Sequence, residues 1–458
     1  MQGDLDRFPN YRREELQVNH SPHMASVLLA SASYGGTLAA VRCLGRHGFR
    51  VNVISSSHSS PAASAWSRYV HKAHTGPKEQ DTARFIARLL ELGRAEPGQI
   101  LLPTSDETAW LYTAFERQLG QYFRLLQPPG ETIFRILDKA KFADAAMRAG
   151  LATLPSWEPD SETRVSQLAP ELSYPILIKR RTHVHEAVNH KGVLIISPND
   201  LALEYGRYMR TQTAHKQGTQ HLWASGLPFL QKFVSVGPEG ILSVSGYIDR
   251  SGSLFVTRCA SKVYQRSQPV GVGVCFESRA HLEELSQAVR RLCRELGYFG
   301  MFEVEFIRFN SDWAVIDFNP RLFNQMALDI HRGMPIPLFA CLDALGDHAA
   351  LSKAVTAACD YSDEPNTVFC DRFTFRAILM AGKVTRRLSK QDVIRWHAWL
   401  RDHAHRMVDV ASDSEDRIPY FVHAMSELKL GLRSLPKFLR LPRRTELDSC
   451  IDPQDAKL

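Results

Sequence analysis

The chain has 458 residues, of which 44% are hydrophobic and 23% charged, and this ordinary composition predicts two or three packed domains. The formal net charge of +7 suits anionic ligands, but no zinc-finger, RRM-type or basic motif in the body indicates nucleic-acid binding. No apolar run is long enough to span a bilayer, and the eight scattered cysteines support neither a disulfide framework nor a zinc knuckle.

The first 24 residues are polar and irregular, so we expect a flexible extension over residues 1–24. They lack the apolar core of a signal peptide, which predicts a cytoplasmic protein.

An α/β region is predicted from residue 25 to residue 125. Its first elements, SVLLASA, LAAVRCLGRHG and RVNVISS, read as a strand-helix-strand unit of a parallel sheet. Dinucleotide binding is improbable, because Gly35 and Gly36 replace the G-x-G-x-x-G pattern and no acid follows the second strand. A later strand, QILLPTSDE, ends in Asp106 and Glu107, for which helix capping and substrate contact both stay open.

Two lysines come off the ends of apolar elements in the next segment. Asp138 is predicted to cap the helix KAKFADAAMRA, which Lys139 opens, and the buried strand YPILIKRR carries Lys179 near its end. A lysine in that position must reach solvent or meet an anion. The loop RTHVHEAVNHKG follows, and its irregularly spaced histidines favour phosphate or substrate contacts over a metal.

The segment from residue 228 to residue 297 is predicted to contain three strands and a helix. PFLQKFV is a buried strand, and ILSVSGYIDRSGSLFVTRCASKVYQ forms two strands around a turn. Arg258, Lys262 and Arg266 come off the second of these strands, either as a solvated edge or as a clamp on a transferred phosphate or carboxylate. The helix RAHLEELSQAVRRLCREL carries a leucine stripe and stops at Gly297.

Residues 300–322, GMFEVEFIRFNSDWAVIDFNPRL, read as two strands joined by a short polar turn. One face of each strand is apolar and the other is acidic. If residues 310–312 form a three-residue loop, Phe309 pairs with Trp313.

That register sets Glu305 opposite Asp317 and Glu303 opposite Asn319. Like charges that face each other across a ladder destabilise it unless a cation lies between them, and these oxygen donors suit Mg²⁺. Arg321 adds a positive fork nearby. A solvated acidic strand face is the alternative, but an Asn-Pro-Arg sequence after the strand is not needed for solvation. Whether Glu303 is a further metal ligand stays open.

Beyond residue 345 the sequence mixes short helical patterns with loops and ends in LKLGLRSLPKFLRLPRR. Pro436 and Pro442 interrupt this segment, so we expect no long continuous helix there. A basic tail that packs its leucines on the body is favoured over a membrane-surface or partner-binding segment.

Taken in order, the Asp138-Lys139 pair, the Lys179 strand, the Gln231 strand and the acidic hairpin resemble the ATP-grasp superfamily. Its members are carboxylate-amine ligases related to carbamoyl phosphate synthetase and biotin carboxylase. The resemblance covers about residues 25 to 345. It implies an α/β fold with a Rossmann-like pre-ATP-grasp domain at 25–125, an ATP-grasp domain at 126–345 and a mainly helical C-terminal extension with a basic tail at 346–458.

The resemblance also implies ATP and Mg²⁺ as cofactors and assigns roles to individual residues. The nucleotide-binding positions would be Lys139, Lys179, Gln231, the backbone of Lys232, Phe233 and Val234, and Glu239. The metal ligands would be Glu305, Asp317 and Asn319, and the catalytic residues Arg321, Arg258 and Lys262.

Three features depart from the family pattern. Asp317 replaces the usual Glu, and Gln231 replaces the usual acid. The loop at residues 180–192, expected to cover the triphosphate, has one glycine, so its contacts to phosphate would come from Arg180, Arg181, His183, His185 and Lys191.

By analogy, the reaction is activation of a carboxylate by ATP to an acyl phosphate, followed by attack of an amine. The small-molecule carboxylate and amine cannot be identified from the sequence. A non-catalytic ATP-binding regulatory module and a membrane-associated biosynthetic adaptor stay open as alternatives, as does a homodimer.

Overall fold

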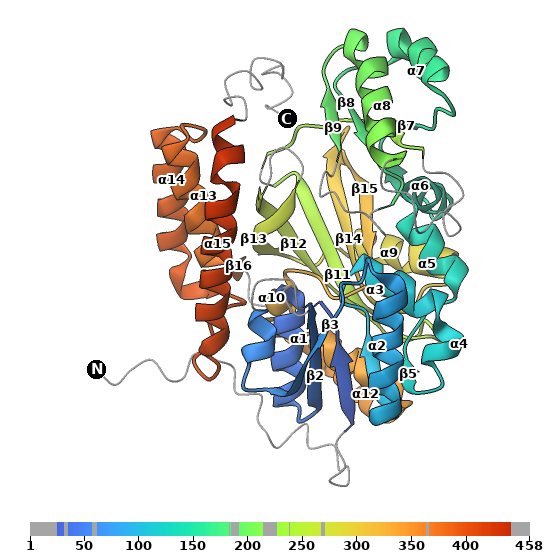
Figure 1. Cartoon of the computed structure of the whole chain (residues 1–458), viewed down its shortest axis with the longest axis vertical. Coiled ribbons are helices and arrows are strands. Elements are labelled where there is room, and N and C mark those ends of the chain that lie inside the picture. Colours follow the sequence, from blue (N-terminus) through green and yellow to red (C-terminus); the bar gives the residue numbers. More distant parts are fainter. Residues whose placement is uncertain are drawn as a thin grey trace.

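The structure of the chain, a computed structural model, describes residues 25–31, 35–56, 62–182, 184, 192–213, 227–237, 239–266, 271–362 and 366–440. For residues 211–213 and 432–440 it describes only the helical backbone. The strands in these ranges form three sheets. Figure 1 shows a parallel sheet at the bottom, a small sheet at the top and a large sheet between them.

The parallel sheet has the strand order β3-β2-β1-β4-β5. Its topological switch point therefore lies between β1 and β4, as is typical of doubly wound α/β folds. The predicted strand-helix-strand unit is confirmed, whereas β3 and β5 were not predicted. The elements are β1 (Ser26–Leu29), α1 (Gly35–Arg46), β2 (Arg50–Ser56), η1 (Ala63–Trp66), β3 (Val70–Gly76), α2 (Thr82–Ala95), β4 (Gln99–Leu102), α3 (Asp106–Ala114), α4 (Glu116–Leu119) and β5 (Phe123–Leu125).

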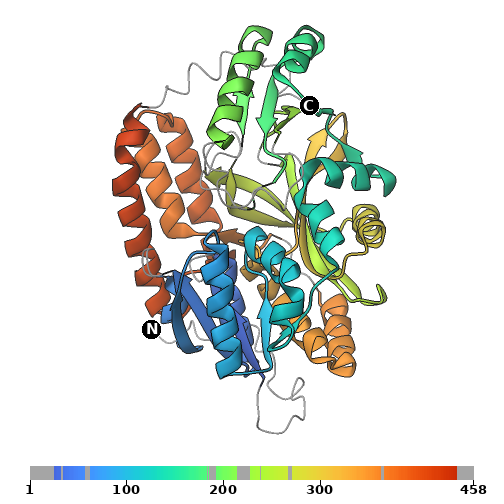
Figure 2. The same cartoon turned by 45° about the vertical axis from the view of Figure 1, so that its right-hand side comes forward.

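The small sheet, which we call the lid, has the order β7-β10-β8-β9, and its neighbouring strands are antiparallel. Two helices cover it, and Figure 2 shows them standing above the rest of the molecule. The elements are β7 (Ser156–Trp157), α7 (Glu162–Leu168), η2 (Ala169–Glu171), β8 (Ile176–Lys179), β9 (Val193–Ile195), α8 (Pro198–Thr213) and β10 (Phe229–Lys232).

The large sheet has eight strands in the order β17-β16-β13-β12-β11-β14-β15-β6. The expected helix that ends at Gly297 is confirmed as α9. The elements are α5 (Gly130–Leu137), α6 (Lys139–Arg148), β6 (Ala152–Thr153), β11 (Ile241–Ile248), β12 (Phe255–Arg266), β13 (Val272–Arg279), α9 (Glu283–Leu296), β14 (Gly300–Phe309), β15 (Asp312–Asn319), α10 (Met326–His331), α11 (Ile336–Leu345) and α12 (His348–Asp360).

The C-terminal region adds two strands and a layer of helices. β16 (Val368–Cys370) pairs with β13 and β17 (Met407–Val408) pairs with β16, so this region extends the large sheet. The helices are α13 (Arg372–Val384), α14 (Lys390–Asp402), η3 (Ala404–Arg406) and α15 (Ile418–Arg440). None of the helices in the described ranges has both the length and the apolar character that crossing a membrane requires.

The expectation that Pro436 prevents a long helix is wrong, because α15 is one helix of 23 residues that contains this proline. A proline inside a helix removes one backbone hydrogen bond and crowds one preceding carbonyl. A helix can accommodate that local cost by bending rather than ending.

The body and the lid have separate hydrophobic cores. Leu28 of β1 and Val304 of β14 belong to the same core, so the parallel sheet and the large sheet pack as one body. The lid has a core of its own, in which Ile178 of β8, Tyr205 of α8 and Leu230 of β10 are buried. Among the described residues, the lid core has no member in common with the body core, although Val184, between β8 and β9, is buried in the core of the body.

The turn between β14 and β15 offers a test of the local backbone. Asn310 and Ser311 have φ angles of 47° and 64°, the left-handed pair that a two-residue type I′ turn requires. Asn tolerates this conformation better than Ser. Ser311→Gly is therefore expected to raise the free energy of unfolding by about 0.5–1 kcal/mol in a denaturant titration. Asn310→Gly is the matched control and should change stability less, and a destabilised Ser311→Gly protein would contradict the turn assignment.

Candidate functional site

The hairpin β14–β15 brings the predicted acidic residues together. Glu305 faces Asp317 and Glu303 faces Asn319, as the sequence predicts. Neighbouring β11 adds Ser243 opposite Glu305. Because side chains alternate along strands, these residues share one face of the large sheet.

The predicted turn is wrong by one residue. The loop contains only Asn310 and Ser311, so Phe309 pairs with Asp312 and Trp313 pairs with Arg308. A register shift between Glu305 and Phe306 inserts one extra residue into β15 and restores the predicted pairs beyond it.

Each of the two facing carboxylates forms an ion pair with a lysine. Lys262 Nζ of β12 donates to Glu305 Oε1 at 2.5 Å, and Lys139 Nζ of α6 donates to Asp317 Oδ1 at 2.7 Å. Burial opposes the charge on the Lys262 ammonium, but the carboxylates of Glu305 and Glu303 outweigh it and raise the pKa of Lys262. The two lysines thus balance the like charges across the ladder.

Local capping explains how Lys139 reaches the sheet. Asp138 accepts hydrogen bonds from the backbone N–H groups of Ala140 and Lys141, which confirms the predicted N-cap of α6. Lys139 is the first residue of that helix, and its own N–H donates to Arg181 O at 2.8 Å. The helix start is therefore fixed beside β15.

Glu303 is buried at the centre of a hydrogen-bond network. Its Oε1 accepts from Ser243 Oγ and from Gln325 Nε2 at 2.8 Å, and its Oε2 accepts from Asn319 Nδ2. Burial and the charge of Glu305 raise the pKa of Glu303. Both oxygens are engaged, so the contacts fit a residue that orients Asn319 better than a direct metal ligand.

The contacts of Glu303 with Ser243 and Gln325 were not predicted. The alternation in ILSVSGYI, which places Ser243 and Ser245 on one strand face, was a usable signal. No motif in the sequence pointed to Gln325.

Arg321 connects the hairpin to the parallel sheet. Its guanidinium donates to Asn319 Oδ1 at 2.7 Å and to Asp106 Oδ1 at 2.9 Å, just beyond the carboxyl end of β4. Burial opposes its charge, but nearby carboxylates, Asp106 first, outweigh it and raise the pKa of Arg321. Ser105 rather than Asp106 caps α3, in a capping box with Thr108.

The lid brings together Lys179 and Gln231, two of the residues that the sequence assigns to nucleotide binding. Lys179 Nζ donates to Gln231 Oε1 at 3.0 Å and lies 5.9 Å from the centre of the Phe229 ring. Gln231 Nε2 donates to Ser156 Oγ at 3.2 Å. Lys179 therefore lies on β8, a central strand of the lid, whereas Lys139 lies on α6.

The remaining predicted nucleotide positions lie along and after β10. The backbone N–H of Lys232 donates to Pro155 O and that of Phe233 to Pro175 O, while Val234 follows directly. Glu239 lies just before β11, with its side chain 75% exposed and 3.2 Å from Arg279. The adenine and ribose roles of these residues stay predictions.

Arginines expected to contact phosphate have protein partners instead. Arg258 is buried and donates to the backbone oxygens of Thr257, Arg332 and Ala358. Its catalytic role stays a prediction, and the observed contacts place it in the packing of β12 against α10 and α12.

The two arginines at the start of the covering loop are similarly engaged. Arg180 Nε donates to Tyr208 Oη at 3.0 Å, and Arg181 is paired with Asp138 and Glu158. The other predicted contacts of this loop, by His183, His185 and Lys191, lie outside the described residues.

The oxygen donors fit Mg²⁺ by chemistry. Glu305, Asp317 and the Asn319 carboxamide are hard oxygen ligands on one sheet face. Among the residues that the structure describes, no three His, Cys, Asp or Glu side chains form a metal-binding group by themselves. A metal here would therefore depend on the carboxamide and on ligands such as phosphate oxygens and water.

No family model matches the chain. Biotin carboxylase of Pseudomonas aeruginosa is 25% identical over 211 residues, which cover 44% of this chain and 43% of that protein. The chain spans less than half the length of the curated relatives that it matches.

Many solved structures have a similar fold, and two of them illustrate it. The biotin carboxylase domain of the Hydrogenobacter thermophilus 2-oxoglutarate carboxylase, a dimer in complex with MgADP, ADP and bicarbonate, has a TM-score of 0.57 and 17% identity, covering 71% of this chain and 70% of that one. An L-amino acid ligase from Bacillus licheniformis has a TM-score of 0.54 and 13% identity, covering 74% of this chain and 77% of that one. The resemblance to the ATP-grasp superfamily and the predicted fold class are confirmed.

The Glu303 network gives a prediction for nucleotide binding. Glu303 accepts one hydrogen bond from Asn319 and one from Gln325 with different oxygens. Glu303→Gln replaces one of these oxygens by an NH₂ group, which cannot accept, so the Asn319 carboxamide should lose its orientation. We expect the Mg²⁺-dependent affinity for ATP to fall roughly tenfold in calorimetry. Glu283→Gln, an exposed change on α9, is the control, and equal affinities of both variants would contradict the orienting role of Glu303.

A second prediction concerns Asp329, which is buried and accepts from Ser245 Oγ at 2.5 Å. Burial raises the pKa of Asp329 to about 6. The folded protein then retains a proton that the unfolded chain releases, so the contribution of Asp329 to stability falls as pH rises from about 4 to about 6. Asp329→Asn should remove about 3 kcal/mol of this pH dependence in denaturant unfolding. Asp312→Asn, an exposed change, is the control. If the free energy of unfolding of Asp329→Asn depended on pH as that of the parent chain does, the role of Asp329 would be refuted.

Proposed function

We propose that the chain is an ATP- and Mg²⁺-dependent ligase that activates a carboxylate as an acyl phosphate and joins it to an amine. The observation that carries the proposal is the pair of facing carboxylates, Glu305 and Asp317, each in contact with a lysine and beside Arg321. The similarity to biotin carboxylase and to an L-amino acid ligase supports a reaction that forms a carbon-nitrogen bond.

We assign some of these side chains to binding the phosphates and others to balancing the charge on the acceptor carboxylate. Lys139 from α6 and Lys179 from the lid approach from different elements and would bind the phosphates from two sides. Arg321 and Lys262 would balance the charge that develops as the phosphoryl group moves to the carboxylate. Mg²⁺ held by Glu305, Asp317 and Asn319 would supply further charge neutralisation.

The lid would exclude water during this step. An acyl phosphate that remained open to solvent would hydrolyse before the amine arrived. The lid packs around its own core, which suits an element that changes its position relative to the body.

Cytoplasmic location and dimerisation are parts of the same proposal. The seven cysteines among the described residues are free thiols, which fits a reducing compartment. The dimer named for the Hydrogenobacter domain supports testing a homodimer here.

A trapping assay tests the ligase without knowledge of the amine. The protein is incubated with MgATP, pools of candidate carboxylates and hydroxylamine, which converts an acyl phosphate to a hydroxamate. We expect hydroxamate and ADP in equal amounts, and Asp317→Ala should lower both at least a hundredfold because one facing carboxylate is lost. Asp312→Ala, on the same strand but exposed, is the control.

Two outcomes would refute the proposal. ATP binding without ADP release for every pool would favour a regulatory module. Unchanged turnover in a folded Asp317→Ala protein would exclude the assigned metal site.

A further inference from the structure

Large apolar side chains lie in solvent on α13 and α15. Met380 and Val384 of α13 are 66% and 69% exposed, and Phe421, Met425 and Leu428 of α15 are 65%, 67% and 52% exposed. Spacings of three and four residues place each set on one side of its helix. We call these five residues the docking face.

The two halves of the docking face belong to neighbouring helices. At the start of α13, Asp371 Oδ2 contacts His423 Nε2 of α15 at 2.9 Å, and Thr374 Oγ1 lies 3.3 Å from the same nitrogen. Figures 1 and 2 show the helices side by side in the outer layer. His423 lies on the buried side of α15, so Phe421 and Met425 point away from the body.

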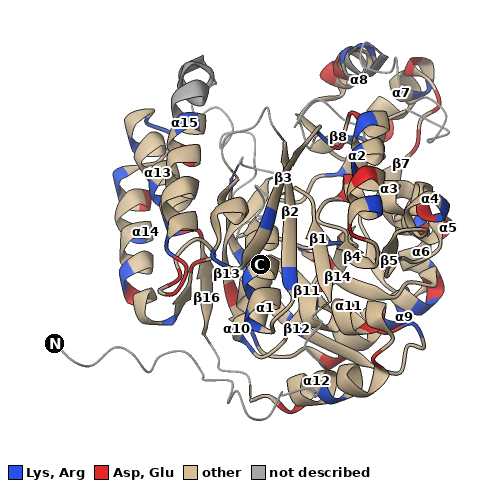
Figure 3. Cartoon of the chain, turned by 60° about the horizontal axis from the view of Figure 1, so that its bottom comes forward, with Lys and Arg blue, Asp and Glu red and all other residues tan. Residues whose placement is uncertain are grey.

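The helices that carry the docking face are basic. Residues 371–440 contain 14 Lys and Arg but only 8 Asp and Glu. Arg376 and Lys383 are exposed at helical spacing from Met380, and Lys429 directly follows Leu428. Figure 3 shows Lys and Arg along the outer sides of α13 and α14.

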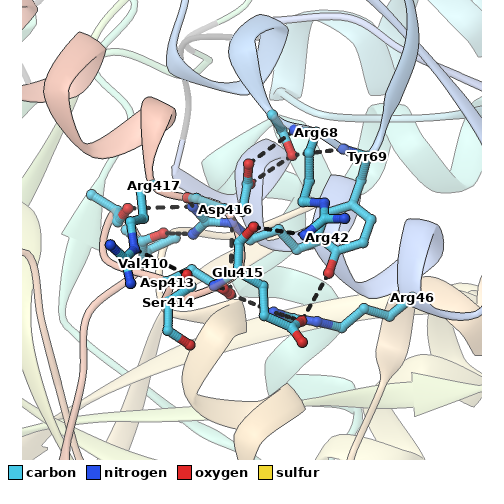
Figure 4. Close-up of polar contacts among 12 residues, drawn as sticks. Arg42, Arg46, Arg68, Tyr69, Val410, Asp413, Ser414, Glu415, Asp416 and Arg417 are labelled. Carbon is cyan, nitrogen blue, oxygen red and sulfur yellow. Dashed lines mark hydrogen bonds and ion pairs between the residues drawn. The ribbon is translucent and has the colours of Figure 1, made fainter.

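The acids in this region have protein partners. Figure 4 shows the acidic loop before α15 in contact with α1, where Arg42 and Arg46 bind Asp416 and Asp413. All eight acids form such contacts: Asp371 with His423, Asp392 with Ser389, Asp402 with Arg401, Asp409 with Arg372, Asp413 with Arg46, Glu415 with Tyr69, Asp416 with Arg42, and Glu427 with Arg266. The outward surface therefore keeps the basic charge.

We propose that the docking face binds the protein peripherally to an anionic lipid bilayer. Phe, Met, Leu and Val side chains would enter the boundary between headgroups and acyl chains, while Arg376, Lys383 and Lys429 would contact lipid phosphates. A second copy fits less well, because a two-fold interface would place this basic surface against itself. Nucleic acid fits less well, because its phosphate backbone has no apolar groups to pack against the docking face. The inference does not depend on the ligase activity.

Flotation with vesicles tests the proposal on the full chain. We expect binding to vesicles of equimolar phosphatidylglycerol and phosphatidylcholine, weaker binding at high salt, and little binding to phosphatidylcholine alone. The double variant Phe421→Gln/Met425→Gln should lose about tenfold or more in vesicle affinity. Lys383→Gln should lose roughly fivefold.

Matched controls separate the face from general surface effects. Leu203→Gln removes an apolar side chain of similar exposure from α8, and Arg84→Gln removes an exposed arginine from α2. Both should bind vesicles like the parent chain. Equal losses in these controls, or no binding to anionic vesicles, would overturn the proposal.

Two other outcomes would also overturn it. A dimer in sedimentation experiments that dissociates in Phe421→Gln/Met425→Gln would identify the face as a self-interface. Binding of polyglutamate that this variant abolishes, without binding to vesicles, would identify an acidic protein as the partner.

Discussion

The site depends on the repulsion between two carboxylates that face each other across one β-ladder. A sheet does not tolerate such a pair unless cations lie beside it. Here the two cations come from different parts of the chain, Lys262 from β12 and Lys139 from the start of α6. The capping of α6 by Asp138 and the length of β12 are therefore conditions for a stable hairpin as well as for any chemistry at it.

The alternation of polar and apolar residues made the hairpin predictable, even though its turn was not. A two-residue turn without a bulge would have placed Asp317 on the opposite face from Glu305. The extra residue in β15 returns Asp317 and Asn319 to the acidic face. The side-chain pattern constrains the face that each residue occupies, whereas the division between turn and bulge depends on backbone angles that the pattern does not encode.

Other parts of the structure lacked a local signal. β16 and β17 have three and two residues, too few for a periodic pattern, and they form because β16 pairs with the edge of β13 and β17 pairs with β16. Arg258 looked like a phosphate ligand because it is basic and near the site. Two of its three backbone acceptors, Arg332 and Ala358, are far away in the sequence, so only tertiary packing identifies them.

The separate core of the lid affects how parts of the molecule open locally. Cooperative units of a protein follow its packed cores, and a unit with a core of its own can open while its neighbours stay folded. The amides of β8 and β10 should then exchange their hydrogens together, at a lower free energy than those of β11 and β14. The protein would therefore lose its lid in a subglobal step while the body remains folded.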